Sequence, residues 1–204
     1  MFCIKNSTES SFRERGSKFL GFLFPADSED AFADGLEKLK SKYPDATHHC
    51  YGWRLNPAQV KEFSTDDGEP SGTAGLPILN QLKSFEIINA GIVVVRYYGG
   101  TKLGKSGLIE AYGLAAKKCL EEASLIAIKP VRLFEVQYPY PEENNIQQLI
   151  NSYELKVMES EYLEHVTLKV ACPIKTATRI EKELEGMEHL NIIFKKLEEH
   201  FIAG

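Results

Sequence analysis

A β-branched run, a glycine-rich loop and an amphipathic stretch follow one another near the middle of the chain. The run INAGIVVVRYY, residues 88–98, is typical of a central strand buried on both faces. Residues 107–123 repeat apolar side chains at helical spacing and predict a helix. The loop between them, GGTKLGKSG at residues 99–107, contains G-x-x-x-x-G-K-S, which is the P-loop pattern of nucleotide-binding proteins. This strand, loop and helix constrain the fold more than any other stretch.

The P-loop hypothesis meets two obstacles. In a P-loop, Lys105 would reach the phosphates and Ser106 would hold magnesium. The metal also needs an Asp at the end of another strand, and no Asp follows Asp67. The fold further needs several parallel strands with crossover helices, whereas after Ser106 the first domain has only one helix and one short strand left. A nucleotide-binding protein or NTPase using Lys105 and Ser106 is therefore an alternative, and we expect an anion-facing turn in another fold.

Composition and charge indicate an ordinary globular protein. The 204 residues are 43% hydrophobic and 26% charged. Residues 1–129 carry 16 basic and 16 acidic side chains, whereas residues 130–204 carry 8 and 13. This balance excludes nucleic-acid binding by bulk charge. The four cysteines are far apart and no apolar run has membrane-spanning length, so we expect a cytoplasmic protein without a membrane partner.

Local patterns predict the remaining elements of the first part. Residues 10–25 suit two short strands, and residues 28–43 suit a helix capped by Ser28 or Asp27. HHCYGWRL at residues 48–55 reads as a strand, KEFS as a second, and residues 77–85 as a helix.

The last third predicts the order β-α-β-β-α-β, which is typical of a ferredoxin-like unit. We therefore expect an α+β protein with domains at residues 1–129 and 130–204.

The segment STDDGEPSGTAG, residues 64–75, predicts a loop. Its acids repel one another unless cations or backbone N–H groups meet them, and its Ser and Thr can cap the next helix. We expect a structural turn that also contacts a partner, through Asp66, Asp67, Glu69, Ser71 and Thr73.

His48, His49 and Cys50 are ligand types for a transition metal. In a strand, His48 and Cys50 share one face and His49 lies on the other, so at most two could share an ion. A metal-dependent hydrolase using His48, His49 and the acidic loop is a further alternative, although we expect no metal, no cofactor and no catalytic residue.

Cationic and aromatic side chains surround the glycine-rich loop. Such a set suits phosphate contacts and base stacking on RNA, although one Tyr in the core and solvated lysines would explain it equally well. The candidate residues are Arg96, Tyr97, Tyr98, Gly99, Gly100, Lys102, Gly104 and Lys105.

Three ordered motifs, DATHHCYGWRL, FSTDDGEPSGTAGLPIL and GIVVVRYYGGTKLGKSGLIEAYG, closely resemble the IMPACT family, in its bacterial YigZ-like branch. The resemblance covers residues 1–125 and implies a ribosomal protein S5 domain 2-like first domain, followed by a ferredoxin-like one. Eukaryotic members are associated with regulation of translation under amino-acid starvation. This chain departs from the family pattern at Ser106, where Gly is usual, and at Glu110, where Arg is usual. The first change creates the P-loop match.

Together these observations favour a binding module over an enzyme. We expect a translation-associated regulator whose partner is RNA, the ribosome or a translation-associated protein, without a DNA-specific site. The contacts are expected at residues 96–107 and 64–73.

Overall fold

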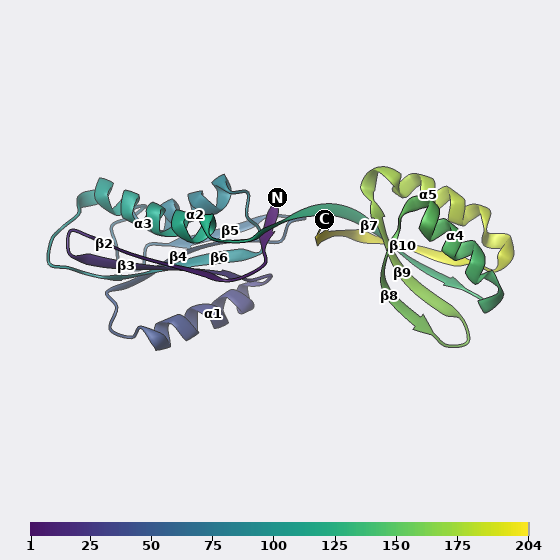
Figure 1. The fold of residues 1–204 in the computed structure, drawn as a ribbon, viewed down its shortest axis with the longest axis horizontal. Coiled ribbons are helices and arrows are strands. Elements are labelled where there is room, and N and C mark those ends of the chain that lie inside the picture. Colours follow the sequence, from purple (N-terminus) through teal and green to yellow (C-terminus); the bar gives the residue numbers. More distant parts are fainter. Residues whose placement is uncertain (204) are drawn as a thin grey trace. The chain divides into compact units, whose positions relative to one another are not determined.

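The computed structural model describes residues 1–203 and divides into two compact units, residues 1–128 and residues 129–204 (Figure 1). Strand β7, Leu125–Tyr138, runs through the division without interruption. The described residues form two mainly antiparallel sheets and five α-helices, consistent with an α+β fold.

The first unit is built on an antiparallel sheet. Its strand order is β2-β3-β6-β4-β5, and every pairing between neighbours is antiparallel. The strands are β2 Thr8–Glu14, β3 Ser17–Pro25, β4 His48–Leu55, β5 Lys61–Thr65 and β6 Ala90–Tyr97. β6 is the central strand, as the β-branched run predicted, and it is buried from Ala90 to Arg96.

Helices cover both faces of this sheet (Figure 1). Helix α1, Glu29–Lys42, packs on one face, and α2, Gly75–Ser84, and α3, Gly104–Glu121, pack on the other. The alternation of a strand explains the two cores. Side chains of Ile92 and Val94 join the cluster beneath α2 and α3, and Val93 and Val95 join the cluster beneath α1.

Two details concern the ends of elements. The Ser28 hydroxyl accepts a hydrogen bond from the backbone N–H of Ala31 at 3.2 Å, so it caps α1 as the sequence indicated. A short strand that the sequence did not reveal, β1 at Phe2–Ile4, pairs with the first residues of β7.

The second unit follows the predicted order of elements. After β7 come α4 Glu143–Tyr153, β8 Lys156–Tyr162, β9 Val166–Pro173, α5 Ile174–Gly186 and β10 Ile193–Ala203, with short 3-10 turns at Tyr140–Glu142 and Glu188–Leu190. β9 lies between β7 and β8, and β10 pairs with β7. Helices α4 and α5 lie together on one face of this sheet (Figure 1). Their apolar stripes, including Ile146 and Ile180, pack on Phe134 and Val170.

Within residues 1–203, no helix combines the length and the apolar character needed to cross a bilayer.

Candidate functional site

The acidic loop between β5 and α2 is held by its own first carboxylate. Asp66 accepts backbone hydrogen bonds from Gly72 at 2.8 Å and from Ala74 and Gly75 at 2.9 Å. The last two N–H groups open α2, so Asp66 caps this helix from a distance in sequence. Burial raises the pKa of the Asp66 carboxyl, but these backbone donors lower it more, and the net pKa lies below the ordinary value.

The cap predicted from the sequence is therefore corrected. We expected a hydroxyl of Ser71 or Thr73 to cap α2. Instead the Thr73 hydroxyl donates to the carbonyl of Pro70 at 2.6 Å, and Ser71 is exposed. The carboxylate at Asp66 prevails because it can accept from several backbone donors at once.

The second carboxylate fixes the loop to β4. Asp67 Oδ2 accepts the backbone N–H of His49 at 2.6 Å, and the Asp67 carbonyl lies 2.7 Å from His48 Nδ1. This contact assigns the His48 proton to Nδ1, because a carbonyl oxygen can only accept. Cys50 Sγ–H donates to the carbonyl of Asp66 at 2.9 Å. The first residues of β4 are thus tied to the loop.

The third carboxylate is buried. The side chain of Glu69 forms an ion pair with Arg96 of β6, and both side chains are only 5% exposed. The Tyr112 hydroxyl donates to Glu69 Oε1 at 2.8 Å, and His48 Nε2 lies 3.7 Å from the same oxygen. Arg96, which the sequence placed among the surface cations, is therefore an internal partner of the acidic loop.

Two groups near Glu69 stay neutral. Burial is the largest cause that raises the pKa of Cys50 and of Tyr112 far above their ordinary values. Neither side chain is therefore available as an ionised nucleophile.

The glycine-rich loop is shaped by close packing. A Cβ on Gly99 would lie 1.9 Å from the backbone carbon of Gly16, and the Gly99 N–H donates to Ser17 Oγ at 3.2 Å. Gly100 and Gly104 have φ angles of 87° and 74°, which favour glycine. These glycines serve the turn, and the antiparallel neighbours of β6 are not those of a P-loop sheet.

A pocket of about 500 Å³ lies between the two loops and the first turns of α3. Glu69 and Arg96 line it together with His48, and Lys102 and Lys105 contribute the exposed cations. The remaining lining residues are Pro70, Tyr98, Leu103, Gly104 and Leu108. No side chain caps the start of α3, so its first N–H groups remain available to an anion.

The predicted site residues thus divide into two groups. Arg96 and Thr73 are buried, and Tyr97, Asp66 and Glu69 are partly or largely buried. The exposed ones are Tyr98, Gly99, Gly100, Lys102, Gly104, Lys105, Asp67 and Ser71.

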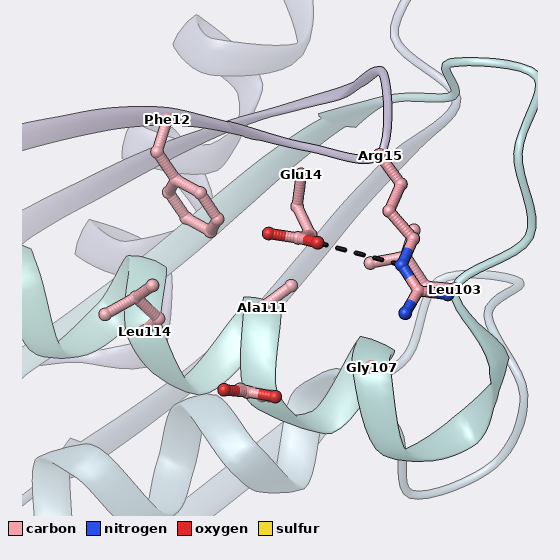
Figure 2. Close-up of a pocket in the computed structure, with 8 residues that line it drawn as sticks. Phe12, Glu14, Arg15, Leu103, Gly107, Ala111 and Leu114 are labelled. Atoms are coloured by element: carbon pink, nitrogen blue, oxygen red, sulfur yellow. Dashed lines mark ion pairs between the residues drawn. The ribbon is translucent and has the colours of Figure 1, made fainter.

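A smaller hollow of about 160 Å³ lies against the first turns of the same helix and shares Leu103 with the pocket. Figure 2 shows Phe12, Glu14 and Arg15 of the β2–β3 hairpin lying over α3, with Leu103 and Gly107 beneath Arg15. Arg15 forms an exposed ion pair with Glu14 at 3.8 Å. Sequence reasoning missed Arg15 because only the contact between Gly16 and Gly99 brings the hairpin turn to this loop.

The metal hypothesis lacks a suitable donor set. Across residues 1–203, no group of three or more His, Cys, Asp or Glu side chains could hold a metal ion. His48 and Cys50 face the acidic loop, whereas His49 is buried with its pKa lowered by burial. The two faces predicted for these residues are those observed.

Comparison with known proteins places this geometry in context. The Impact N-terminal domain matches residues 15–120, and a domain of unknown function, DUF1949, matches residues 136–185. The IMPACT family member YigZ of Escherichia coli is 33% identical over 90% of this chain and 91% of its own. A protein IMPACT homolog of Saccharomyces cerevisiae is 33% identical over 45% of this chain and 36% of its own. The crystal structure of a hypothetical protein aligns with a TM-score of 0.69 and 29% identity over 97% of both chains.

Proposed function

The chain belongs to the IMPACT family, and on this premise we propose that it is a cytoplasmic, translation-associated regulatory module that contacts RNA phosphates on the ribosome. The contact surface is the exposed part of the glycine-rich loop and the start of α3, from Tyr98 to Lys105. In the same proposal the first unit has the S5 domain 2-like fold. The second unit has the ferredoxin-like one, with strand order β10-β7-β9-β8.

One observation carries the RNA contact. Lys102 and Lys105 are exposed on either side of an uncapped helix start. The dipole and the free N–H groups of such a start attract phosphate, and lysines add mobile positive charge. The rest of the first unit is close to neutral, so Lys102 and Lys105 form a local basic patch.

The acidic loop has a supporting role in this proposal. Asp66 and Glu69 are committed to backbone donors and to Arg96, so they hold the loop beneath the pocket. Ser71 is exposed, and Asp67 is exposed although its Oδ2 holds the His49 N–H, so these two residues remain for contact with a protein partner.

The second unit is less suited to phosphate, because residues 130–204 carry 8 basic and 13 acidic side chains. Glu135, Lys169 and Glu159 lie side by side across β7, β9 and β8 on the face opposite the helices. The Lys169 amine is paired with Glu159 at 2.6 Å, which leaves the carboxylate of Glu135 unmatched in this row. We therefore assign the RNA contact to the first unit alone.

Ribosome co-sedimentation tests this function. Wild type and Lys102→Ala/Lys105→Ala are compared at low and moderate salt, with Lys175→Ala/Lys182→Ala as a control of equal charge on α5. We expect the wild type and the control to co-sediment at low salt and the loop variant to remain in the supernatant. Absence of binding by the wild type, or equal binding by all three proteins, would refute the proposal.

A further inference from the structure

A buried charged pair lies at the floor of the pocket between the acidic loop and α3. Arg96 and Glu69 line it while each side chain is only 5% exposed, so they form its floor. We propose that this pocket binds one phosphomonoester group, carried by the 5′ end of an RNA or by a free mononucleotide. This inference rests on the proposed function, because the same glycine-rich loop would contact the ligand.

The charges that line the pocket match a dianion. Three cations, Arg96, Lys102 and Lys105, surround it against the single carboxylate of Glu69. A phosphomonoester carries about 1.5 to 2 negative charges at neutral pH, whereas an internal phosphodiester carries about one. The lining therefore favours the monoester over a link within an RNA chain.

Donor groups converge on the pocket from separate segments. Gly104 and Lys105 supply the N–H groups of the uncapped start of α3. His48 also lines the pocket, with its Nδ1 held by the Asp67 carbonyl at 2.7 Å. Backbone and side-chain donors together are typical of built phosphate sites.

Arg96 adds an independent observation. Its two terminal nitrogens are engaged by Glu69 and by Ser17 Oγ, the latter at 3.2 Å. Its Nε is buried and is one of three such side-chain atoms without a hydrogen-bond partner in residues 1–203. Buried donors are normally satisfied. The floor of the pocket therefore retains unused donor capacity that an oxyanion would engage after a small shift of the floor.

A terminal phosphate suits this pocket better than an internal link. An internal phosphodiester continues into a nucleotide on both sides, whereas a terminal phosphate can turn three oxygens toward the pocket with its nucleoside directed outward. Tyr98 lies at the mouth and is 48% exposed, with the guanidinium of Arg96 5.6 Å from its ring centre. The other face of this ring is available for stacking a base.

The test uses the full chain and three probes. Two fluorescent RNAs of one sequence carry either a 5′-phosphate or a 5′-hydroxyl, and AMP serves as the free mononucleotide. We expect the phosphorylated RNA to bind about tenfold tighter than the other, because charge-assisted hydrogen bonds to one group are lost. AMP should compete with the phosphorylated RNA, and Lys102→Ala/Lys105→Ala should abolish the preference while Lys175→Ala/Lys182→Ala retains it.

The outcomes separate this inference from the proposed function. Equal affinity for both RNAs without competition by AMP overturns the phosphomonoester pocket, and if that binding still needs the two loop lysines the RNA-binding proposal stands. Conversely, AMP binding that depends on the loop lysines, without binding of either RNA, supports the pocket and refutes the RNA-binding proposal. Thermal unfolding of each variant verifies that it is folded.

Discussion

Arg96 of β6 and Glu69 of the acidic loop form an ion pair inside the first unit, although 26 residues separate them along the chain. The Tyr112 hydroxyl of α3 donates to the same carboxylate at 2.8 Å. A strand, a loop and a helix thus meet at one buried carboxylate. This junction holds the acidic loop against the start of α3 and gives the pocket its floor.

Replacing Glu69 should destabilise the protein strongly. In Glu69→Gln the guanidinium of Arg96 would remain buried without its counter-charge, and such losses cost about 3–5 kcal/mol. Urea unfolding measures the change. Glu121→Gln is the matched control, because Glu121 is 53% exposed and pairs with Lys117 along one helix. Exposed pairs contribute about 1 kcal/mol or less. Equal effects of the two changes would contradict the claim that the buried Glu69 carboxylate stabilises the fold.

Loss of the Asp66 carboxylate should open the acidic loop. Asp66→Ala leaves three backbone N–H groups without their acceptor, and we expect a loss of about 2 kcal/mol in the free energy of unfolding. Faster amide exchange at Gly72, Ala74 and Gly75 would accompany it. The exposed Asp45 provides the control, since Asp45→Ala should leave both measurements unchanged.

Acid should weaken the fold through the same carboxylate. The pKa of Asp66 in the folded chain lies below its ordinary value of 3.8. The stability that the Asp66 carboxylate contributes is therefore fully present above about pH 4, and it is lost as the pH falls through the lower, folded-state pKa. Between pH 6 and pH 2.5, the free energy of unfolding should fall more steeply for wild type than for Asp66→Asn. Parallel curves would show that Asp66 does not contribute in this way.

A methyl group at Gly99 should displace the glycine-rich loop. Its Cβ would meet the backbone of Gly16 at 1.9 Å, which no side-chain rotation can relieve. We expect Gly99→Ala to cost about 1–3 kcal/mol and to weaken RNA binding. Gly186→Ala at the end of α5 is the control, because nothing lies within 4 Å of the added atom. A fully stable Gly99→Ala protein would contradict the close approach.

Local patterns predicted the elements but not the partners of their side chains. Strand β4 at His48–Leu55 and helix α5 at Ile174–Gly186 follow from alternation and helical spacing over short windows. The burial of Arg96 was overlooked, although strand alternation places it on the face of Ile92 and Val94. Its partner Glu69 is distant in sequence, and no local pattern links the two residues.

Other features of the site depend on long-range contacts in the same way. The hairpin turn at Gly16 reaches Gly99 only because β3 and β6 pair. That approach brings Arg15 beside the start of α3. The sequence grouped Lys102 and Lys105 in one loop, whereas in the structure Lys105 lies in the first turn of α3, and the pocket beside them required the folded chain.

The salt dependence of RNA binding tests the central claim most directly. Affinity for a single-stranded RNA is measured over a series of KCl concentrations for wild type and for Lys102→Ala/Lys105→Ala. Each lost phosphate contact reduces the slope of log K against log salt by about 0.7, so the double change should reduce it by about 1.4. Equal slopes and equal affinities for the two proteins would contradict a phosphate contact at this loop.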